Sequence, residues 1–184
     1  LGDSPLLVFV GMAFERKGLA TVLEALRHSQ HHNARLVVVG TGRVAKFQRL
    51  AKALDVHERV VFTGHQTNVA RFYGAGDLFL QPTLYEPFPN VNLEAMACGV
   101  PVLTTETAGG ADLVEHGRLG YLVSGPDAIT EMVEMIDLHL QLTETDREFM
   151  SRCCWEKARR MTLEDNARQT IKVFEEVVQE KSRV

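Results

Sequence analysis

The sequence predicts an α/β protein with a Rossmann-like, doubly wound parallel sheet, followed by C-terminal helices. Short apolar segments without polar alternation recur up to about residue 125, which is typical of strands buried on both faces. Segments with apolar residues at helical spacing separate them. Glycine-rich turns follow several apolar segments. These turns would lie at the carboxyl ends of the strands, which is the edge where a parallel sheet binds ligands.

Six apolar segments are predicted to be strands. They span residues 6–11, 34–40, 59–64, 77–82, 100–105 and 120–123. Two helices are predicted between the first three strands, at residues 17–29 and 44–56. Each carries an apolar stripe that faces the sheet. The stripes consist of Leu19, Val22, Leu23 and Leu26 in the first helix, and Phe47, Leu50, Ala51 and Leu54 in the second.

After residue 126 the pattern is helical, with helices predicted at 127–142, 144–160 and 163–181. The first of these has an apolar face and an acidic opposite face, so it is predicted to pack on the core rather than on a membrane, where Lys and Arg would dominate. Its apolar residues are Ile129, Met132, Val133, Ile136 and Leu140. The length of 184 residues suits one domain, 1–184, with a sheet core at 6–125 and a helical tail at 126–184.

Composition limits the classes of function. Hydrophobic content of 45% and charged content of 24% are ordinary for a globular protein, and the net charge of −4 argues against a nucleic-acid partner. No apolar run approaches the roughly 20 residues that span a bilayer, and the first residues lack signal-peptide features. The three cysteines, Cys98, Cys153 and Cys154, form no CxxC spacing. We therefore expect no disulfide, no metal site and a cytoplasmic location.

Glu86 and Glu94, with seven residues between them, are the candidate ligand-binding acids. Glu86 lies in a Pro-rich loop after the segment 77–82, and Glu94 lies where a helix begins. Backbone N–H groups of such a loop and helix start bind phosphate, while the carboxylates accept hydrogen bonds from hydroxyls. The alternative is a surface acid and a helix N-terminal acid stabilised by the helix dipole.

Three cations are predicted at the same edge of the sheet. Arg16 and Lys17 lie in the turn after the strand that ends at Gly11, and Lys46 lies one helical turn beyond the glycines of the second turn. Arg binds a diphosphate through a bidentate fork and Lys as a point charge. The alternative for Arg16 and Lys17 is a solvated turn.

Gly40, Gly42 and Ala45 imitate a dinucleotide-binding fingerprint after a strand. Such a site also needs an acid at the end of the next strand, to bind the ribose hydroxyls. The segment 59–66 ends without one, so NAD and FAD are disfavoured. We interpret the two glycines as a turn that lets a phosphate approach the backbone.

Residues 9–19, 37–64 and 86–123 together resemble the C-terminal half of retaining glycosyltransferases of family 4, which have the two-domain GT-B fold. The resemblance covers about residues 6–125. Within the family, the turn "ERKG" and the helix "KFQRLAKALDV" are most similar to those of enzymes that build the lipopolysaccharide core.

This resemblance implies a role for each candidate residue. Glu94 would bind the ribose hydroxyls, and Glu86 would face and orient the donor sugar. Arg16 or Lys17, together with Lys46, would stabilise the diphosphate, whose charge develops as the glycosidic bond breaks. Gly11, in the turn at the ligand edge, is also expected to be a donor-binding residue. The base, uracil, would lie at residues 62–64, near Thr63. Family members generally work without a metal, so no cofactor is expected.

Two positions depart from the pattern of many relatives. Met12 stands where an Arg is frequent, and Arg16 is expected to replace it. Pro89 stands where a Gly is frequent, and proline has no N–H group. The amides that bind phosphate would then come from Phe88, Asn90 or Val91.

The implied function is the donor-binding half of a hexosyltransferase that uses a UDP-sugar, with UDP-glucose expected, and a lipopolysaccharide or other glycan acceptor. In the family the acceptor site lies in an N-terminal domain, which this chain lacks, so the chain alone is expected to be inactive. That domain would also make any peripheral contact with the inner membrane, and helix 163–181 would cross back to it. The alternatives are a sugar-nucleotide epimerase domain of the same fold and a non-catalytic nucleotide-binding module.

Overall fold

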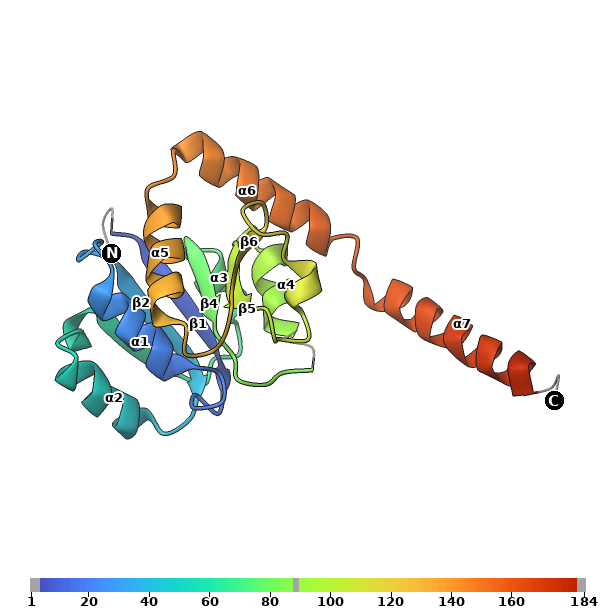
Figure 1. Cartoon of the computed structure of the whole chain (residues 1–184), viewed down its shortest axis with the longest axis horizontal. Coiled ribbons are helices and arrows are strands. Elements are labelled where there is room, and N and C mark those ends of the chain that lie inside the picture. The colour runs from blue at the N-terminus through green and yellow to red at the C-terminus, as the bar shows by residue number, and fades with distance from the viewer. Residues whose placement is uncertain (1–3, 88–89, 182–184) are drawn as a thin grey trace.

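The computed structural model describes residues 4–87 and 90–181 and contains one six-stranded parallel sheet (Figure 1). The strand order is β3-β2-β1-β4-β5-β6. The strands are β1 Leu6–Met12, β2 Arg35–Thr41, β3 Val60–Gly64, β4 Leu78–Gln81, β5 Val102–Thr105 and β6 Gly120–Val123. Each of the six predicted segments forms one of them, so the predicted fold class is confirmed.

Helices cover both faces of the sheet because its central strands are apolar on both sides. On β1, Leu7 and Phe9 belong to one buried cluster, while Val8 and Val10 belong to the other. The first cluster is closed by α1 Leu19–His28, α2 Val44–Ala53 and α5 Ile129–Leu140. The second is closed by α3 Ala70–Tyr73, α4 Asn90–Ala97 and α6 Glu144–Ala158. Two short 3₁₀ helices, His57–Arg59 and Ala111–Leu113, lie in the connections.

The predicted stripes of α1 and α5 face the core. All four stripe residues of α1 are buried, and Met132, Ile136 and Leu140 of α5 are buried as well. Asp137 and His139 of α5, for which no prediction was made, are also buried. Each has a partner: Ser29 Oγ donates to Asp137, and the His139 ring is held by Tyr121 and by the carbonyl of Asp77.

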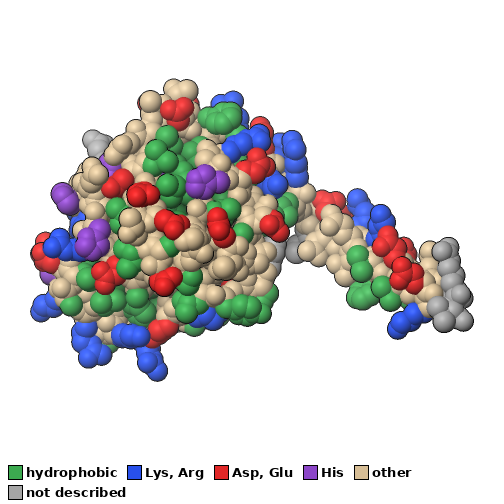
Figure 2. Space-filling model, viewed as in Figure 1, with side chains coloured by type: hydrophobic (Ala, Val, Ile, Leu, Met, Phe, Trp, Pro, Cys, Tyr) green, Lys and Arg blue, Asp and Glu red, His purple; other side chains and the backbone are tan. Residues whose placement is uncertain are grey.

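The helix α7 Leu163–Lys181 projects from the body of the protein (Figures 1 and 2). Its apolar residues Ile171, Val173, Phe174 and Val177 are exposed, as predicted for a helix that packs elsewhere. Among the helices of the described residues, none is both long and apolar enough to cross a bilayer.

The strand order reverses between β1 and β4, where the chain runs outward in both directions along the sheet. Ligands bind in sheets of this type at the carboxyl ends of the two strands that flank the reversal. Here those ends lead into residues 13–18 after β1 and residues 82–87 after β4. Both segments belong to the loops in which the sequence placed the candidate site.

Candidate functional site

The turn after β1 positions Arg16 and Lys17. Ala13 has a φ of 57°, in the left-handed region, and its carbonyl oxygen accepts hydrogen bonds from the backbone N–H groups of Arg16 and Lys17. Gly18 has a φ of 78°, and a Cβ atom there would lie 2.0 Å from the carbonyl oxygen of Pro82. The turn therefore packs directly against the loop that follows β4.

Lys17 crosses over the end of β1. A Cβ atom on Gly11 would lie 3.4 Å from Lys17 Cγ, so Gly11 leaves room for the lysine side chain. Only 7% of Lys17 is exposed, which is rare for a lysine without a charged partner. The sequence predicted Gly11 as a donor-binding residue, and in the structure the lysine chain is its immediate neighbour.

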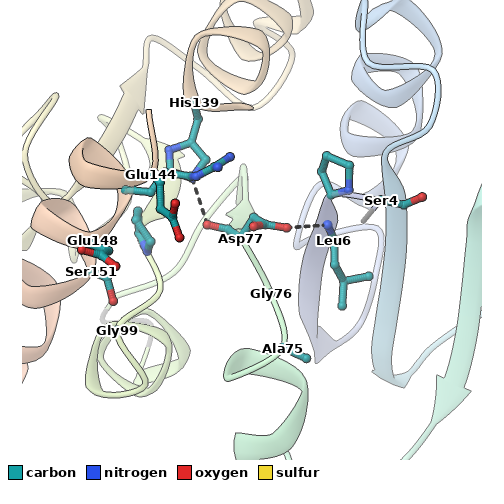
Figure 3. A pocket seen from close by; sticks show the side chains of 13 residues that line it. Ser4, Leu6, Ala75, Gly76, Asp77, Gly99, His139, Glu144, Glu148 and Ser151 are labelled. Carbon is teal, nitrogen blue, oxygen red and sulfur yellow. Dashed lines mark hydrogen bonds between the residues drawn. The ribbon is translucent and has the colours of Figure 1, made fainter. Parts of the chain in front are cut away.

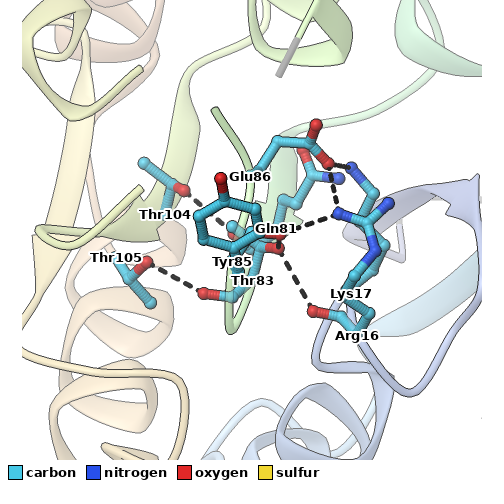
Figure 4. Close-up of polar contacts among 8 residues, drawn as sticks. All are labelled: Arg16, Lys17, Gln81, Thr83, Tyr85, Glu86, Thr104 and Thr105. Carbon is cyan, nitrogen blue, oxygen red and sulfur yellow. Dashed lines mark hydrogen bonds and ion pairs between the residues drawn. The ribbon is translucent and has the colours of Figure 1, made fainter. Parts of the chain in front are cut away.

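Glu86 is that partner (Figure 4). Lys17 Nζ donates to Glu86 Oε2, and Arg16 Nη1 donates to the same oxygen at 2.8 Å and to the carbonyl of Tyr85 at 2.7 Å. Burial raises the pKa of the Glu86 carboxyl, but the hydrogen bonds and charges of Lys17 and Arg16 outweigh burial and lower that pKa overall. The acid and two of the cations that the sequence predicted thus form one ionised cluster.

Threonines and a glycine fix the loop that carries Glu86. Thr104 Oγ1 donates to the carbonyl of Gln81 at 2.9 Å, and Thr105 Oγ1 donates to that of Thr83 at 3.2 Å. The Gly109 N–H donates to the carbonyl of Glu86 at 2.8 Å, and a Cβ atom on Gly109 would lie 1.6 Å from the Pro87 oxygen. The sequence analysis missed Gly109, which lies in the "AGG" turn that follows β5.

Glu94 is exposed on α4 and is held by a buried tyrosine. Tyr73 Oη donates to Glu94 Oε2 at 3.2 Å. Burial raises the pKa of Tyr73, and the Glu94 charge raises it further, so the phenol stays a hydrogen-bond donor. One Glu94 oxygen is occupied by the phenol, and the exposed position leaves the carboxylate accessible to a ligand. Tyr73 was not among the predicted site residues.

Lys46 lies farther out on the same edge. Its Nζ is 3.4 Å from Glu15 Oε1, and Arg43 Nε is 3.8 Å from the same oxygen. Figure 2 shows Lys and Arg side chains gathered along the lower side of the body, over α2 and the neighbouring turns. Glu15 and Arg43 were missed by the sequence analysis, and Glu15 holds Lys46 close to the turn after β1.

The remaining predicted residues lie around this cluster. Asn90 and Val91 begin α4, where the first N–H groups of a helix have no partner within it. Thr63 is half-buried near the end of β3, and its hydroxyl lies 3.4 Å from the carbonyl of Val38. Phe88 lies outside the described residues, as does Pro89.

Packing accounts for the glycines of the second turn. Gly40 has a φ of 122°, and a Cβ atom there would lie 2.0 Å from the carbonyl oxygen of Gly11. A Cβ atom on Gly42 would lie 2.7 Å from the ring of Phe14. Close contact between the turns after β1 and β2 therefore requires both glycines. The sequence interpretation had assigned them to the approach of a phosphate.

A cavity of about 720 Å³ lies at the opposite edge of the sheet (Figure 3). Asp77 and His139 line it, near the amino ends of β1 and β4. His139 Nε2 donates to the carbonyl of Asp77 at 3.0 Å, so Nδ1 accepts from Tyr121 Oη at 3.2 Å. Burial lowers the pKa of His139, in agreement with a neutral ring. This histidine joins α5 to the sheet, and the cavity lies away from the ion-paired cluster.

Within residues 4–87 and 90–181, no group of three or more His, Cys, Asp or Glu side chains is arranged to hold a metal ion. Cys98 is exposed, Cys153 and Cys154 are buried, and all three are free thiols.

The strand order, the helices on both faces and the reversal at β1 and β4 define one Rossmann-like half of a GT-B glycosyltransferase fold. The family described as "Glycosyl transferases group 1" matches residues 1–152, and the chain belongs to this family.

Three relatives illustrate the similarity. A lipopolysaccharide glucosyltransferase of Escherichia coli is 36% identical over 134 residues, which are 71% of this chain and 36% of that protein. The crystal structure of a glycosyltransferase involved in lipopolysaccharide biosynthesis is 31% identical with a TM-score of 0.82, over 89% of this chain and 45% of that one. An Anabaena protein in complex with UDP-glucose is 22% identical with a TM-score of 0.84, over 95% and 49% of the two chains. This chain thus spans less than half the length of each of these relatives.

Proposed function

We propose that this chain is the donor-binding half of a retaining glycosyltransferase, which transfers glucose from UDP-glucose to a lipopolysaccharide or other glycan acceptor. One observation carries the proposal: Arg16 and Lys17 meet Glu86 at the point where the strand order reverses. Two cations and an acid at this place match a donor that has a diphosphate at its centre and a sugar at its end.

In the proposed mechanism, Arg16 and Lys17 bind the diphosphate. The diphosphate gains negative charge as the bond to the sugar breaks, so cations already in position stabilise the transition state. Lys17 is the stronger of the two in this role, because its charge lies in a mostly buried site where electrostatic interactions exceed those in water. We propose that these cations and the loop amides act without a metal ion.

Glu86 changes partner in this mechanism. In the free protein it accepts from Lys17 and Arg16 through one oxygen. A diphosphate that takes over the two cations leaves the Glu86 carboxylate to accept hydrogen bonds from the hydroxyls of the sugar. The nucleotide therefore engages first, and the sugar is oriented as a consequence.

The nucleoside is proposed to lie between Glu94 and β3. Glu94, fixed by Tyr73, would accept hydrogen bonds from the ribose hydroxyls. Thr63 lies on β3, two strands from β1, and a strand spacing of about 4.8 Å gives a separation of roughly 10 Å. That distance suits a base held apart from the diphosphate. Lys46 would contribute a further charge from α2.

The acceptor site is proposed to belong to a second domain, outside residues 1–184. We propose that the reaction takes place in the cytoplasm and that the complete enzyme contacts the inner membrane peripherally. The exposed apolar residues of α7 suit a helix that crosses to the other domain. By this proposal the chain binds donor and does not transfer the sugar.

Calorimetric titration of the chain with UDP, UDP-glucose, GDP and NAD tests the proposal. Binding of UDP and UDP-glucose, with weak or no binding of GDP and NAD, is the expected result. Tight binding of NAD, or of GDP in preference to UDP, contradicts the assignment of the nucleotide. Glycosyl transfer by the chain alone contradicts the assignment of the acceptor site.

A further inference from the structure

Two buried amide side chains lie next to the proposed donor site and have no hydrogen-bond partner among the residues that the structure describes. They are Gln81 and Asn92, each 0% exposed, and both the nitrogen and the oxygen of each amide are unpaired. Buried polar groups are paired in the great majority of cases, because an unpaired one costs stability. Two such side chains therefore call for a functional explanation.

The fold places both amides on the same side of the sheet. Gln81 follows Phe79 by two residues on β4, so its side chain lies on the face where Phe79 packs, the face that α4 covers. Asn92 is in the first turn of α4 and shares a helix face with Ala95 and Met96, which pack on that same side.

Both amides also lie at the carboxyl edge. Gln81 is the last residue of β4, and Figure 4 shows it at the start of the loop that leads to Tyr85 and Glu86. The helix α4 begins at the end of that loop, so its first turn lies at the same edge. Both amides therefore lie between the sheet and the first turn of α4, alongside the Glu86 loop.

The chemistry of an amide indicates what it binds. Each amide offers two N–H donors and one oxygen acceptor, whereas a phosphate only accepts and a cation needs several oxygen ligands. A sugar hydroxyl both donates and accepts, so it pairs with either end of an amide. A group with several hydroxyls matches two amides at the same edge of the sheet best.

We infer that Gln81 and Asn92 form a subsite for the hydroxyls of the hexosyl group of the donor, a role that rests on the function proposed above. The amides are enclosed in the free protein and become accessible when a diphosphate draws Arg16 and Lys17 away from Glu86. Binding of the sugar is thereby coupled to binding of the diphosphate, and glucose without a diphosphate does not bind.

The test replaces each amide by an apolar side chain of similar size, in Gln81→Met and Asn92→Leu. Tyr121→Phe is the matched control, because it removes a buried polar group that is paired with His139 away from this edge. The melting temperature and the dissociation constants for UDP and UDP-glucose are measured for each variant of the chain.

We expect both amide variants to melt about 2–4 °C higher, because each loses an unpaired buried group. Their affinity for UDP stays within about twofold, while their affinity for UDP-glucose falls by about 3–10-fold, the loss of one or two hydrogen bonds. The control melts lower, and its preference for UDP-glucose over UDP is unchanged.

Three outcomes overturn the inference. A preference for UDP-glucose that neither amide variant alters shows that the sugar does not contact the amides. A lower melting temperature in both variants shows that the amides are paired in the free protein. If the unsubstituted chain fails to bind UDP, the proposed function and this inference fall together, whereas UDP binding with an unaltered preference overturns the inference alone.

Discussion

Replacing Glu86 by Gln is expected to destabilise the free protein without weakening its binding of UDP. The substitution removes the charge that faces Lys17, whose side chain is 9% exposed, and Arg16, whose side chain is 45% exposed. A hydrogen bond to a charged group contributes about 1.5–3 kcal/mol. The exposed Arg16 pair contributes little, and a Gln oxygen still accepts one hydrogen bond. The free energy of unfolding is therefore expected to fall by about 1–2 kcal/mol. For a chain of this size that lowers the melting temperature by about 2–8 °C.

Binding of UDP is expected to restore the stability that the Glu86→Gln variant lacks. A diphosphate supplies Lys17 and Arg16 with the negative charge that the Glu86→Gln variant lacks, so saturating UDP should bring the melting temperatures of variant and wild type together. By linkage, the variant should then bind UDP more tightly by the stability that it lost, about 5–30-fold for about 1–2 kcal/mol. Without its carboxylate at position 86, the variant should also lose preference for UDP-glucose over UDP. Thermal melting with and without UDP, and calorimetry with both ligands, measure these effects. Glu115→Gln, which removes an exposed pair with Arg118, is the control and should change stability by less than about 1 kcal/mol.

The same ion pair gives a pH dependence with a defined sign. The pKa of Glu86 is lowered in the folded protein from its ordinary value of 4.5. The stability that the ionised Glu86 carboxylate contributes is therefore fully present above pH 4.5, and it is lost as the pH falls through the lower pKa of the folded protein. The stability gap between wild type and Glu86→Gln should be constant near pH 7 and should close below about pH 4.5. An equal melting temperature at pH 7, together with an unaltered preference for UDP-glucose, would refute the role of Glu86.

Four further substitutions test the rest of the site. Glu94→Gln should weaken UDP binding by about tenfold through lost ribose contacts, and an unchanged calorimetric affinity would remove Glu94 from the site. Lys46→Met should weaken UDP binding by a few-fold at low salt and less at high salt, whereas Glu15→Gln, which frees Lys46, should act in the opposite direction. Gly109→Ala places a methyl group against the Pro87 carbonyl, so it should destabilise the protein by about 1–3 kcal/mol and weaken UDP-glucose binding. Normal stability and binding in that variant would show that the Glu86 loop does not depend on Gly109.

The sheet was predictable because its strands are buried on both faces. Segments such as the one that forms β1 are apolar throughout, and burial on two sides leaves no other arrangement for them. The stripes on α1 and α5 were predictable for a similar reason, since one face of each helix meets the core. The burial of Asp137 and His139 on α5 was not predictable, because each is paired with a residue more than 60 positions away in the sequence.

The composition of the candidate site was predictable, but its pairing was not. Sequence placed Arg16, Lys17 and Glu86 at one edge, because loops at the carboxyl ends of parallel strands share that edge. It gave no sign that Glu86 pairs with both cations, since these contacts join residues 69 and 70 positions apart. Tyr73 and Gly109 went unnoticed for the same reason, as their roles come from contacts with Glu94 and with the Glu86 loop.

The pairing changes how the site should work. If Glu86 were free in the empty protein, its charge would oppose the approach of a diphosphate. Because Lys17 and Arg16 neutralise it, the empty site carries one net positive charge from these three residues, and an incoming diphosphate can displace the carboxylate from the cations. In the proposed mechanism, the displaced carboxylate would lie beside the position of the sugar. A donor that lacks the diphosphate would not drive this exchange, so by this proposal the ion pair makes recognition of the sugar depend on recognition of the nucleotide.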